Sequence, residues 1–275
     1  MKNKGVIIEV PACRNQFLSN LFLVSKKDGC QRPVINLRYL SAHVKYQHCK
    51  MEGLFVIKNL LQRGDFLLKI DLKEAYSVMS ISPKHRKFLR FQWYNKIYQH
   101  TALPFGLVEA PRIFTKTLKP VLGLLRRLVV ILIIYLDDIL IMAESREKLR
   151  SHRDSTLYLL QKLGYVINWK KKILNPTQEI EYLGFQINSE DMMFYRPKTK
   201  IDKKKSNCQN ILSKGRVSVR EIAKLTGKFI SSIQAFFSAN LHCRFLQMSQ
   251  INGLLVGNSY EQNIILSKEA REELN

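Results

Sequence analysis

The pattern of hydrophobic and polar positions divides the chain into two parts of different character. Before about residue 195, short apolar runs rich in β-branched residues predict strands, with a few helical segments between them. From Arg196 onward the apolar residues recur at helical spacing, as Ile201, Cys208 and Ile211 do. The pattern therefore predicts an α+β protein whose part at 196–266 is a helical lobe.

Several segments of the first part have the composition and length of strands. The stretch from Leu21 to Leu40 predicts two strands joined at Asp28-Gly29, because Asp-Gly is a strong hairpin signal. The run FLLKID, Phe66–Asp71, predicts a buried strand that ends in a carboxylate. Two further strands are predicted at Tyr165–Asn168 and Glu181–Ile187.

Capping and stop signals mark the predicted helices. Ser145 fits the N-cap of a helix that Gly164 ends, because glycine favours the left-handed backbone that follows a helix. Ser218 and Glu221 have the spacing of a capping box. Together with apolar periodicity, these signals predict helices at 53–61, 111–125, 145–164 and 218–233.

Two adjacent carboxylates lie inside the apolar stretch Leu128–Met142. The run LVVILII leads into Tyr135-Leu136-Asp137-Asp138, and ILIM comes directly after them. An ionised carboxylate in an apolar setting is costly unless it meets a cation. The stretch predicts a β-hairpin with Asp137 and Asp138 at its tip, and a turn that merely contains two aspartates remains the alternative.

Composition and charge narrow the class of protein. The chain has 275 residues, of which 46% are hydrophobic, so it can bury a sizeable core. Its net charge of +23 is typical of a protein that binds nucleic acid, and the basic residues are spread along the whole chain rather than gathered as in a membrane-surface segment. No signal peptide and no transmembrane run is visible, so we expect an intracellular protein without a membrane partner, in cytoplasm or nucleus.

Basic residues lie beside aromatic residues or on a predicted turn. Between Pro83 and Trp93 the residues Arg86, Lys87 and Arg90 alternate with aromatic rings, which suits a nucleic-acid strand, although a half-buried strand gives the same pattern. The predicted turn near Asp28 carries Lys26, Lys27 and Arg32. These three residues could close over phosphates or simply face solvent.

Asp71, Asp137 and Asp138 are predicted to meet at one edge of a mixed sheet. Hard oxygen ligands of this kind can hold two Mg²⁺ ions, with Mn²⁺ as an alternative, when substrate phosphates complete the coordination. One ion would activate a primer 3′-hydroxyl and the other would stabilise the leaving pyrophosphate. A nuclease could use the same pair of metals, but the basic turn favours a nucleoside triphosphate.

Seven sequence blocks, in order, resemble a retroelement reverse transcriptase, and the pattern is most similar to polymerases of the DIRS-like (tyrosine-recombinase) retrotransposons. The blocks are FLVSKKDGCQRPVINLRYL, LLKIDLKEAY, HRKFLRFQW, LPFGLVEAPRIFTK, IIYLDDILIMA, LGYVINWKKK and EYLGFQI. The resemblance implies an RNA-directed DNA polymerase with a right-hand fold. Fingers and palm would occupy 1–195, a thumb-like lobe 196–266, and the start of a connection to a downstream domain 267–275.

The resemblance also assigns roles to individual residues. Asp71, Asp137 and Asp138 would be catalytic and hold the metals, and Tyr76 would be the steric gate against ribonucleotides. The nucleotide would further contact Lys26 (or Lys27), Arg32, Phe105 and Gly106. The primer grip would be Tyr182, Leu183 and Gly184, with Tyr135 at the primer terminus and Arg86, Lys87 and Arg90 on nucleic acid. The implied partners are an RNA or DNA template with its primer and deoxynucleoside triphosphates, and the oligomeric state stays open.

Some positions depart from the family pattern. Glu74 stands where Asp is usual, Ser80 where Pro is usual, and Val108-Glu109 where small residues are usual. Glu109 adds negative charge near the nucleotide block, so a decayed copy that keeps only nucleic-acid binding is the alternative function. A polymerase that incorporates ribonucleotides is a weaker rival. No ribonuclease H segment is recognisable, so we expect ribonuclease H and recombinase functions elsewhere in the element.

Overall fold

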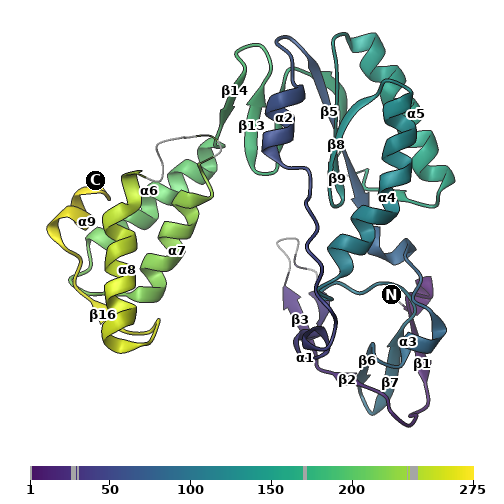
Figure 1. Cartoon of the computed structure of the whole chain (residues 1–275), viewed down its shortest axis with the longest axis horizontal. Coiled ribbons are helices and arrows are strands. Elements are labelled where there is room, and N and C mark those ends of the chain that lie inside the picture. The colour runs from purple at the N-terminus through teal and green to yellow at the C-terminus, as the bar shows by residue number, and fades with distance from the viewer. Residues whose placement is uncertain (1, 26–28, 30, 170–171, 234, 236–240) are drawn as a thin grey trace. The chain divides into compact units, whose positions relative to one another are not determined.

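The computed structural model describes residues 2–25, 29, 31–169, 172–233, 235 and 241–275. It divides into two compact units that are discontinuous in sequence (Figure 1). Unit 1 comprises Met1–Gly53 and Phe66–Pro176, and unit 2 comprises Leu54–Asp65 and Thr177–Asn275. Each unit buries its own apolar clusters, so we describe each by itself.

The central sheet of unit 1 is antiparallel and mostly buried. Its strands lie in the order β10-β5-β9-β8, and β11 also pairs with β5. The predicted strand that begins at Phe66 is confirmed, but it runs two residues beyond Asp71. The bounds are β5 Phe66–Lys73, β8 Ile131–Tyr135, β9 Asp138–Ala143, β10 Val166–Ile167 and β11 Ile173–Thr177.

Two long helices, α4 (Ala110–Arg127) and α5 (Arg146–Lys162), lie beside this sheet (Figure 1). Both were predicted from the sequence and are confirmed. The N-cap Ser145 accepts a hydrogen bond from the Lys148 backbone N–H, and Gly164 has a φ of +82° after the helix ends. Fully buried Phe114 on α4 belongs to the same apolar cluster as the buried strands. This cluster fixes the sheet that carries the acids.

A second sheet of unit 1 has the strand order β1-β7-β6-β2, and β3 pairs with β4 as a separate two-stranded ribbon. The strand–turn–strand prediction for Leu21–Leu40 is confirmed in its two strands, while Asp28 lies outside the described residues. The bounds are β1 Ile7–Val10, β2 Leu18–Ser19, β3 Leu21–Ser25, β4 Gln31–Ile35, β6 Arg90–Trp93 and β7 Lys96–His100, with short helices η1 Lys2–Lys4, α1 Arg38–Ala42, η2 Ala75–Val78 and α3 Pro83–Arg86.

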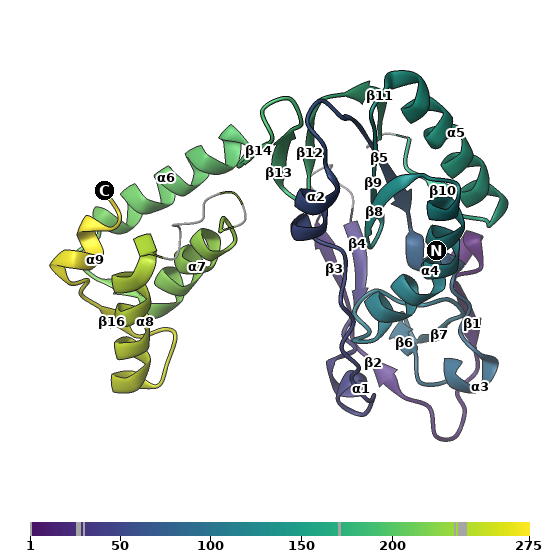
Figure 2. The ribbon, with the colours of Figure 1, turned by 45° about the horizontal axis from the view of Figure 1, so that its top comes forward.

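Unit 2 combines a small antiparallel sheet, β12-β13-β14, with helices that pack on one another (Figure 2). The predicted capping box is present, because Ser218 and Glu221 exchange hydrogen bonds at the start of α7. The bounds are α2 Leu54–Leu60, β12 Glu179–Tyr182, β13 Phe185–Asn188, β14 Met193–Tyr195, α6 Lys198–Leu212, β15 Val217–Ser218, α7 Val219–Ile230, α8 Arg244–Gly257, β16 Asn263–Ile264 and α9 Lys268–Glu272.

Unit 2 shows three features that the sequence pattern does not indicate. The segment Glu181–Ile187 is a hairpin rather than one strand, because Leu183 and Gly184 both take positive φ angles and turn the chain. The segment 267–275 packs into the helical core through buried Ala270 and Leu274. The units divide at residue 176, before the β12–β14 sheet, whereas the sequence pattern changes near residue 196.

None of the helices in the described part of the chain is long and apolar enough to cross a lipid bilayer.

Candidate active site

Asp71 and Asp138 lie directly opposite each other on neighbouring strands. β5 and β9 are antiparallel, with Asp71 paired to Asp138, and Tyr135 on β8 is paired to Asp138 from the other side. Directly opposed residues project from the same face of a sheet, with Cα atoms roughly 4.5–5.5 Å apart. The register therefore brings together two acids that are far apart in sequence.

Asp137 lies in the two-residue turn that joins β8 to β9, as the hairpin prediction requires. Leu136, the first residue of the turn, has a φ of +56°, which is uncommon for a residue other than glycine. The Asp137 carbonyl accepts a hydrogen bond of 2.8 Å from the Leu72 backbone N–H. This bond fastens the turn to β5, next to Asp71.

The carboxylate of Asp71 is buried, with 6% of the residue exposed. Its Oδ1 accepts a hydrogen bond of 2.6 Å from the Asn168 side-chain amide, and its carbonyl accepts one of 2.8 Å from the Asn168 backbone N–H. Asn168 directly follows β10, which pairs with β5. The first bond fixes the orientation of the Asp71 carboxylate, and the second holds Asn168 against the backbone of β5.

Asp138 forms an ion pair with Lys69, with 2.8 Å between Nζ and Oδ1. Both side chains are largely covered by protein. Lys69 stands two residues before Asp71 on the same strand, so its side chain projects from the same face. Lys69 therefore places a positive charge on the face that carries the two acids.

The donor chemistry at this edge fits a hard divalent cation. Like charges directly opposite each other on a sheet are destabilising, so Asp71 and Asp138 gain from a cation between them. Carboxylate oxygens are the ligands that Mg²⁺ prefers. Within the described residues, no three His, Cys, Asp or Glu side chains form a group that could hold a metal ion, and Asp138 is turned to Lys69.

Tyr76 lies beside the acids in an aromatic cluster. Its ring centroid is 4.7 Å from that of Phe105 and 5.3 Å from that of Phe114. Burial, together with the negative charge of Asp137, raises the pKa of the Tyr76 hydroxyl to about 12. Tyr76 is therefore a neutral, rigidly packed ring with Asp137 nearby.

Phe105 and Gly106 link this cluster to the β3–β4 ribbon. Phe105 contacts the Tyr76 ring at a tilt of 37° and still exposes about half of its surface, 51%. Gly106 has a φ of +97°, and a Cβ there would lie 3.4 Å from the Ile35 carbonyl oxygen of β4. A glycine suits both the backbone angle and this close approach.

Of the predicted phosphate contacts, the structure describes Arg32. Lys26 and Lys27 lie outside the described residues. Arg32 belongs to β4, where its backbone pairs with Val24. The ribbon itself forms as predicted.

The predicted nucleic-acid contacts at Arg86, Lys87 and Arg90 have different surroundings. Arg90 is buried, and its guanidinium donates to Gln99 at 2.8 Å and to Gln16 at 2.7 Å. Arg90 thus stabilises the second sheet through hydrogen bonds, and the prediction that it contacts nucleic acid is wrong. Arg86 donates through Nε to a backbone carbonyl, and the Lys87 ammonium lies 5.2 Å from the centre of the Phe88 ring.

Glu109, which departs from the family pattern, is a buried structural residue. Its carboxylate accepts hydrogen bonds from the Arg112 guanidinium and from the Gln47 backbone N–H. The bond from Arg112 is the main cause that lowers the pKa of Glu109. Because Arg112 pairs with the carboxylate, the expectation that Glu109 presents free negative charge to phosphates is wrong.

The predicted primer grip forms the tip of the β12–β13 hairpin in unit 2. Tyr182 is fully buried, and Leu183 and Gly184 have φ angles of +48° and +80°. The Gly184 carbonyl accepts hydrogen bonds from Arg196 at 3.0 Å and from Lys200 at 3.2 Å. These two cations hold the hairpin tip.

Arg196 makes further contacts that connect this hairpin to α7. Its guanidinium carbon lies 4.2 Å from the centre of the Phe185 ring, and it donates to the Ser231 hydroxyl at 2.6 Å and to the Ser231 carbonyl. Ser231 directly follows α7. Arg196 therefore joins the hairpin to the helical part of the same unit.

Sequence reasoning missed Lys69, Asn168 and Arg196. The alternation of side chains along FLLKID places Lys69 on the face of Asp71, so period two could have identified it. Asn168 acts on Asp71, which is distant in sequence. Arg196 acts on Gly184, which lies in a turn that was not predicted. The pattern of apolar positions carries no signal for such partners.

A family model described as "Reverse transcriptase (RNA-dependent DNA polymerase)" matches residues 24–187. The Pro-Pol polyprotein of Simian foamy virus type 3 (strain LK3) is 27% identical over 187 residues, which cover 68% of this chain and 16% of that protein. Polyprotein P3 of Commelina yellow mottle virus is 28% identical over 160 residues, 58% of this chain and 8% of that protein.

The Transposon Tf2-3 polyprotein of Schizosaccharomyces pombe (strain 972 / ATCC 24843) is 25% identical over 170 residues, 62% of this chain and 12% of that protein. The chain thus spans less than a fifth of the length of each of these three relatives.

Solved structures of a foamy viral protease-reverse transcriptase resemble the whole chain. The complex of its dRH form with double-stranded DNA gives a TM-score of 0.78 at 21% identity, covering 99% of this chain and 44% of that chain. The complex with an RNA/DNA hybrid gives 0.74 at 22% identity, covering 98% of this chain and 34% of that chain. The likeness shows a right-hand polymerase fold, so the predicted α+β fold class is confirmed.

Proposed function

Because the chain belongs to the reverse transcriptase (RNA-dependent DNA polymerase) family, we propose that it adds deoxynucleotides to a primer 3′-hydroxyl on a nucleic-acid template. The observation that carries the proposal is the strand register, which pairs Asp71 with Asp138 and puts Asp137 in the adjoining turn. A few carboxylates at one edge of a sheet can hold two divalent ions when substrate phosphates complete the coordination, as a two-metal transfer of a nucleotidyl group requires.

Asp71, Asp137 and Asp138 would hold two Mg²⁺ ions, or Mn²⁺ ions in their place. When bound, the ions would lower the pKa of the attacking hydroxyl and neutralise charge on the leaving pyrophosphate. Asn168 keeps the Asp71 carboxylate oriented. Lys69 neutralises Asp138 through their ion pair. A divalent cation would replace this ammonium as the partner of Asp138.

Tyr76 would select the sugar of the incoming nucleotide. Its ring is held between Phe105 and Phe114, so it cannot move aside to admit a 2′-hydroxyl without breaking aromatic contacts. Its hydroxyl is neutral near pH 7, as for an ordinary tyrosine, so the ring adds no negative charge beside Asp137. A rigid, neutral ring at this place favours deoxynucleotides.

The other nucleotide contacts would come from the β3–β4 ribbon and the LPFG block. Lys26, or Lys27 in its place, and Arg32 would bind the triphosphate, because charge-assisted hydrogen bonds to phosphate suit both side chains. Phe105 would lie against the nucleotide and template base with its exposed ring face. Gly106 would keep that segment close to β4.

We assign the remaining predicted contacts to the duplex. Tyr182, Leu183 and Gly184 would form the primer grip, Tyr135 would lie at the primer terminus, and Arg86 and Lys87 would approach a phosphate backbone. In this scheme residues 1–195 are fingers and palm, residues 196–266 are the thumb, and α9 packs with the thumb. The net charge of +23 supports a long phosphate contact.

An RNA or DNA template with its primer is the partner that the fold neighbours favour, because they were solved with double-stranded DNA and with an RNA/DNA hybrid. We further propose that the chain derives from a DIRS-like retrotransposon, on the order and content of its seven sequence blocks. Ribonuclease H and recombinase activities would be supplied by other parts of the element.

Primer extension on an RNA template, with Mg²⁺ and deoxynucleotides, tests this function. We expect templated products, and none without template. A folded protein that binds the primer-template in a salt-sensitive way but adds no nucleotide would instead be the decayed, binding-only fragment.

Tyr76 variants test the sugar selectivity in the same assay. Tyr76→Ala should reduce the preference for deoxynucleotides over ribonucleotides by about tenfold or more, because the gate is removed. Tyr76→Phe is the matched control and should keep the preference, since the ring remains.

A further inference from the structure

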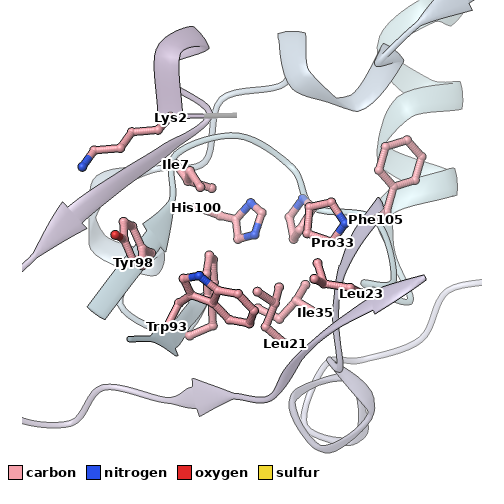
Figure 3. A pocket seen from close by; sticks show the side chains of 12 residues that line it. Lys2, Ile7, Leu21, Leu23, Pro33, Ile35, Trp93, Tyr98, His100 and Phe105 are labelled. Atoms are coloured by element: carbon pink, nitrogen blue, oxygen red, sulfur yellow. The ribbon is translucent and has the colours of Figure 1, made fainter. Parts of the chain in front are cut away.

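Unit 2 contains a cavity of about 710 Å³ that shares no lining residue with the unit 1 cavity in Figure 3. The unit 1 cavity is lined by Phe105 and thus adjoins the proposed nucleotide contacts. The cavity in unit 2 takes none of the residues proposed above to bind metal, nucleotide or primer. Its volume lies within the range of small-molecule sites, about 300–1,000 Å³, so it is a candidate for a separate ligand.

The wall that α6 contributes combines apolar and basic side chains on one face of the helix. Ile201, Cys208 and Leu212 line the cavity, and Lys204 and Lys205 line it between the first two. These positions recur every three or four residues, so they lie above one another on the helix. The face is therefore amphipathic along its length, with two cations in the middle.

Two cations of the cavity converge on one hydroxyl group, that of Ser232. The Lys204 ammonium and the Arg196 guanidinium both donate hydrogen bonds to Ser232 Oγ, the guanidinium at 3.3 Å. The ammonium also lies 5.9 Å from the centre of the Phe229 ring, which lines the same cavity. Arg196 and Lys204 are both partly exposed, so a ligand in the cavity can reach them.

The positive charge at this wall lacks an acidic partner. Lys200, one turn earlier on α6, forms an ion pair with Glu181, but within the described residues neither Lys204 nor Arg196 pairs with a carboxylate. Glu273 also lines the cavity, but its two carboxylate oxygens accept backbone N–H groups at the start of α8, at 2.9 Å each. Burial, and then the charge of Arg196, lowers the pKa of Lys204 to about 8, and a bound anion would counteract this.

We propose that this cavity binds a molecule with an apolar body and one anionic group, a carboxylate or a sulfonate, and that the anionic group pairs with Lys204. Lys204 and Arg196 would supply charge-assisted hydrogen bonds to the anion, while the carbon of the walls suits the apolar body. A nucleic-acid backbone would use the cations but leave the apolar walls empty. The site does not depend on the proposed polymerase activity, since it contains none of the three acids.

Fluorescence titration of the full chain with 8-anilinonaphthalene-1-sulfonate, and separately with N-phenyl-1-naphthylamine, tests the proposal. The second probe has the same rings without the sulfonate. We expect the sulfonate to bind about tenfold tighter or more, because hydrogen bonds to a charged group are stronger than those between neutral groups. Equal affinity for the two probes, or binding of neither, would overturn the proposal.

Lysine variants of α6 test whether Lys204 receives the anion. Lys204→Met removes the ammonium and should reduce the preference for the sulfonate to about twofold or less, whereas Lys204→Arg keeps the charge and should keep the preference. Lys203→Met is the matched control, because it removes the same charge from an exposed neighbour that does not line the cavity. An unchanged preference in Lys204→Met, or an equal loss in Lys203→Met, would refute the role of Lys204.

A pair of isoleucine variants tests the location. Ile201 and Ile230 are similarly exposed, at 39% and 42%, but Ile201 lines the cavity and Ile230 on α7 does not. Ile201→Trp should fill part of the space and weaken binding of the sulfonate about tenfold or more, whereas Ile230→Trp should leave it unchanged. The same affinity in both variants would place the ligand elsewhere and refute the site. Displacement of the sulfonate by excess primer-template would identify a nucleic-acid phosphate as the occupant and contradict the proposed class of ligand.

Discussion

Two hairpins of this chain share the dipeptide Tyr-Leu and differ in the residues that come after it. In the first, Tyr135-Leu136 precedes Asp137-Asp138, the first turn residue alone has a positive φ, and the tip carries two carboxylates. In the second, Tyr182-Leu183 precedes Gly184, and both turn residues have positive φ. Positive φ at both turn residues is what a type I′ turn requires, and Gly184 adopts it without strain, whereas Leu183 does not.

The two tips also differ in how charge is balanced. The Gly184 carbonyl is held by two cations, Arg196 and Lys200. At the acidic tip Lys69 pairs with Asp138, while Asp71 faces Asp138 across the strands. The carbonyl at the Leu183-Gly184 tip is thus paired with cations of its own unit. The Asp137-Asp138 tip would be stabilised by additional positive charge. The comparison thus separates a hairpin that is paired within its own unit from one for which we propose a cation.

Asp137→Asn, which removes a charge from the acidic hairpin, should have the largest effect, on primer extension. The amide keeps the shape of the carboxylate and removes the charge that holds a metal. We expect primer extension to fall at least about 10³-fold, equivalent to about 4 kcal/mol of transition-state stabilisation. Filter binding should show an unchanged affinity for the primer-template, because many phosphate contacts determine it. Wild-type extension by this variant would remove Asp137 from the metal site.

Lys69→Met should have the next largest effect, on stability. The substitution keeps the aliphatic length and removes the cation paired with Asp138, which leaves two opposed carboxylates. We expect a loss of about 2 kcal/mol in the free energy of unfolding without Mg²⁺, since the pair is partly buried. Urea unfolding monitored by circular dichroism measures it.

Mg²⁺ should restore part of this loss in Lys69→Met, because a bound cation replaces the ammonium. The double variant Asp71→Asn, Lys69→Met is the control. It should lose less free energy of unfolding than Lys69→Met alone, and Mg²⁺ should not restore that loss. If Mg²⁺ stabilised Lys69→Met no more than the wild type, Lys69 and the metal would not share a site.

Arg196→Gln should lower the free energy of unfolding by about 1–2 kcal/mol, because it weakens the hairpin that carries Gly184. The variant loses charge-assisted hydrogen bonds to Gly184 and Ser231 and the contact with the Phe185 ring. Lys200→Gln is the matched control, because Lys200 donates to the Gly184 carbonyl but to neither Ser231 group, and it should cost about 0.5 kcal/mol. Urea unfolding compares the two, and equal losses would contradict the role given to Arg196.

Gly184→Ala should have a smaller effect than Arg196→Gln, a loss of about 1 kcal/mol. The left-handed φ of +80° disfavours a Cβ, and the new atom would meet Lys200 Nζ at 2.5 Å, a flexible group that can move. Leu136→Gly is the complementary change, at the first turn residue of the hairpin that carries Asp137. Relief of strain at Leu136 is offset by the greater freedom of the unfolded chain, so we expect a change within about 0.5 kcal/mol. Thermal unfolding of both variants checks the pair.

The elements that local pattern determines were predictable from sequence. The run of β-branched residues, Ser145 and the Ser218–Glu221 box correctly predicted the acidic hairpin and two helices. The turn at Leu183-Gly184 was not predicted. A leucine at positive φ leaves no signal in the pattern of apolar positions, so the whole segment was predicted as one strand. Local pattern therefore predicts elements better than the turns between them.

The side-chain partners were less predictable. Arg90 and Glu109 looked like surface charges near a substrate, yet both are buried with polar partners that come from other segments. Asn168 reaches Asp71 only after β10 has paired with β5. Sequence spacing cannot reveal such pairs, because strand register decides them. The acid positions themselves were predicted, and the fold supplies the reason that they meet.

Electron paramagnetic resonance of bound Mn²⁺ tests the central claim most directly, that Asp71, Asp137 and Asp138 form one cation site. The wild-type chain, with a primer-template and a non-hydrolysable deoxynucleotide, should bind two Mn²⁺ ions, as a two-metal mechanism requires. Asp71→Asn should lose at least one ion while still binding the primer-template. Unchanged Mn²⁺ binding in Asp71→Asn would contradict the assignment.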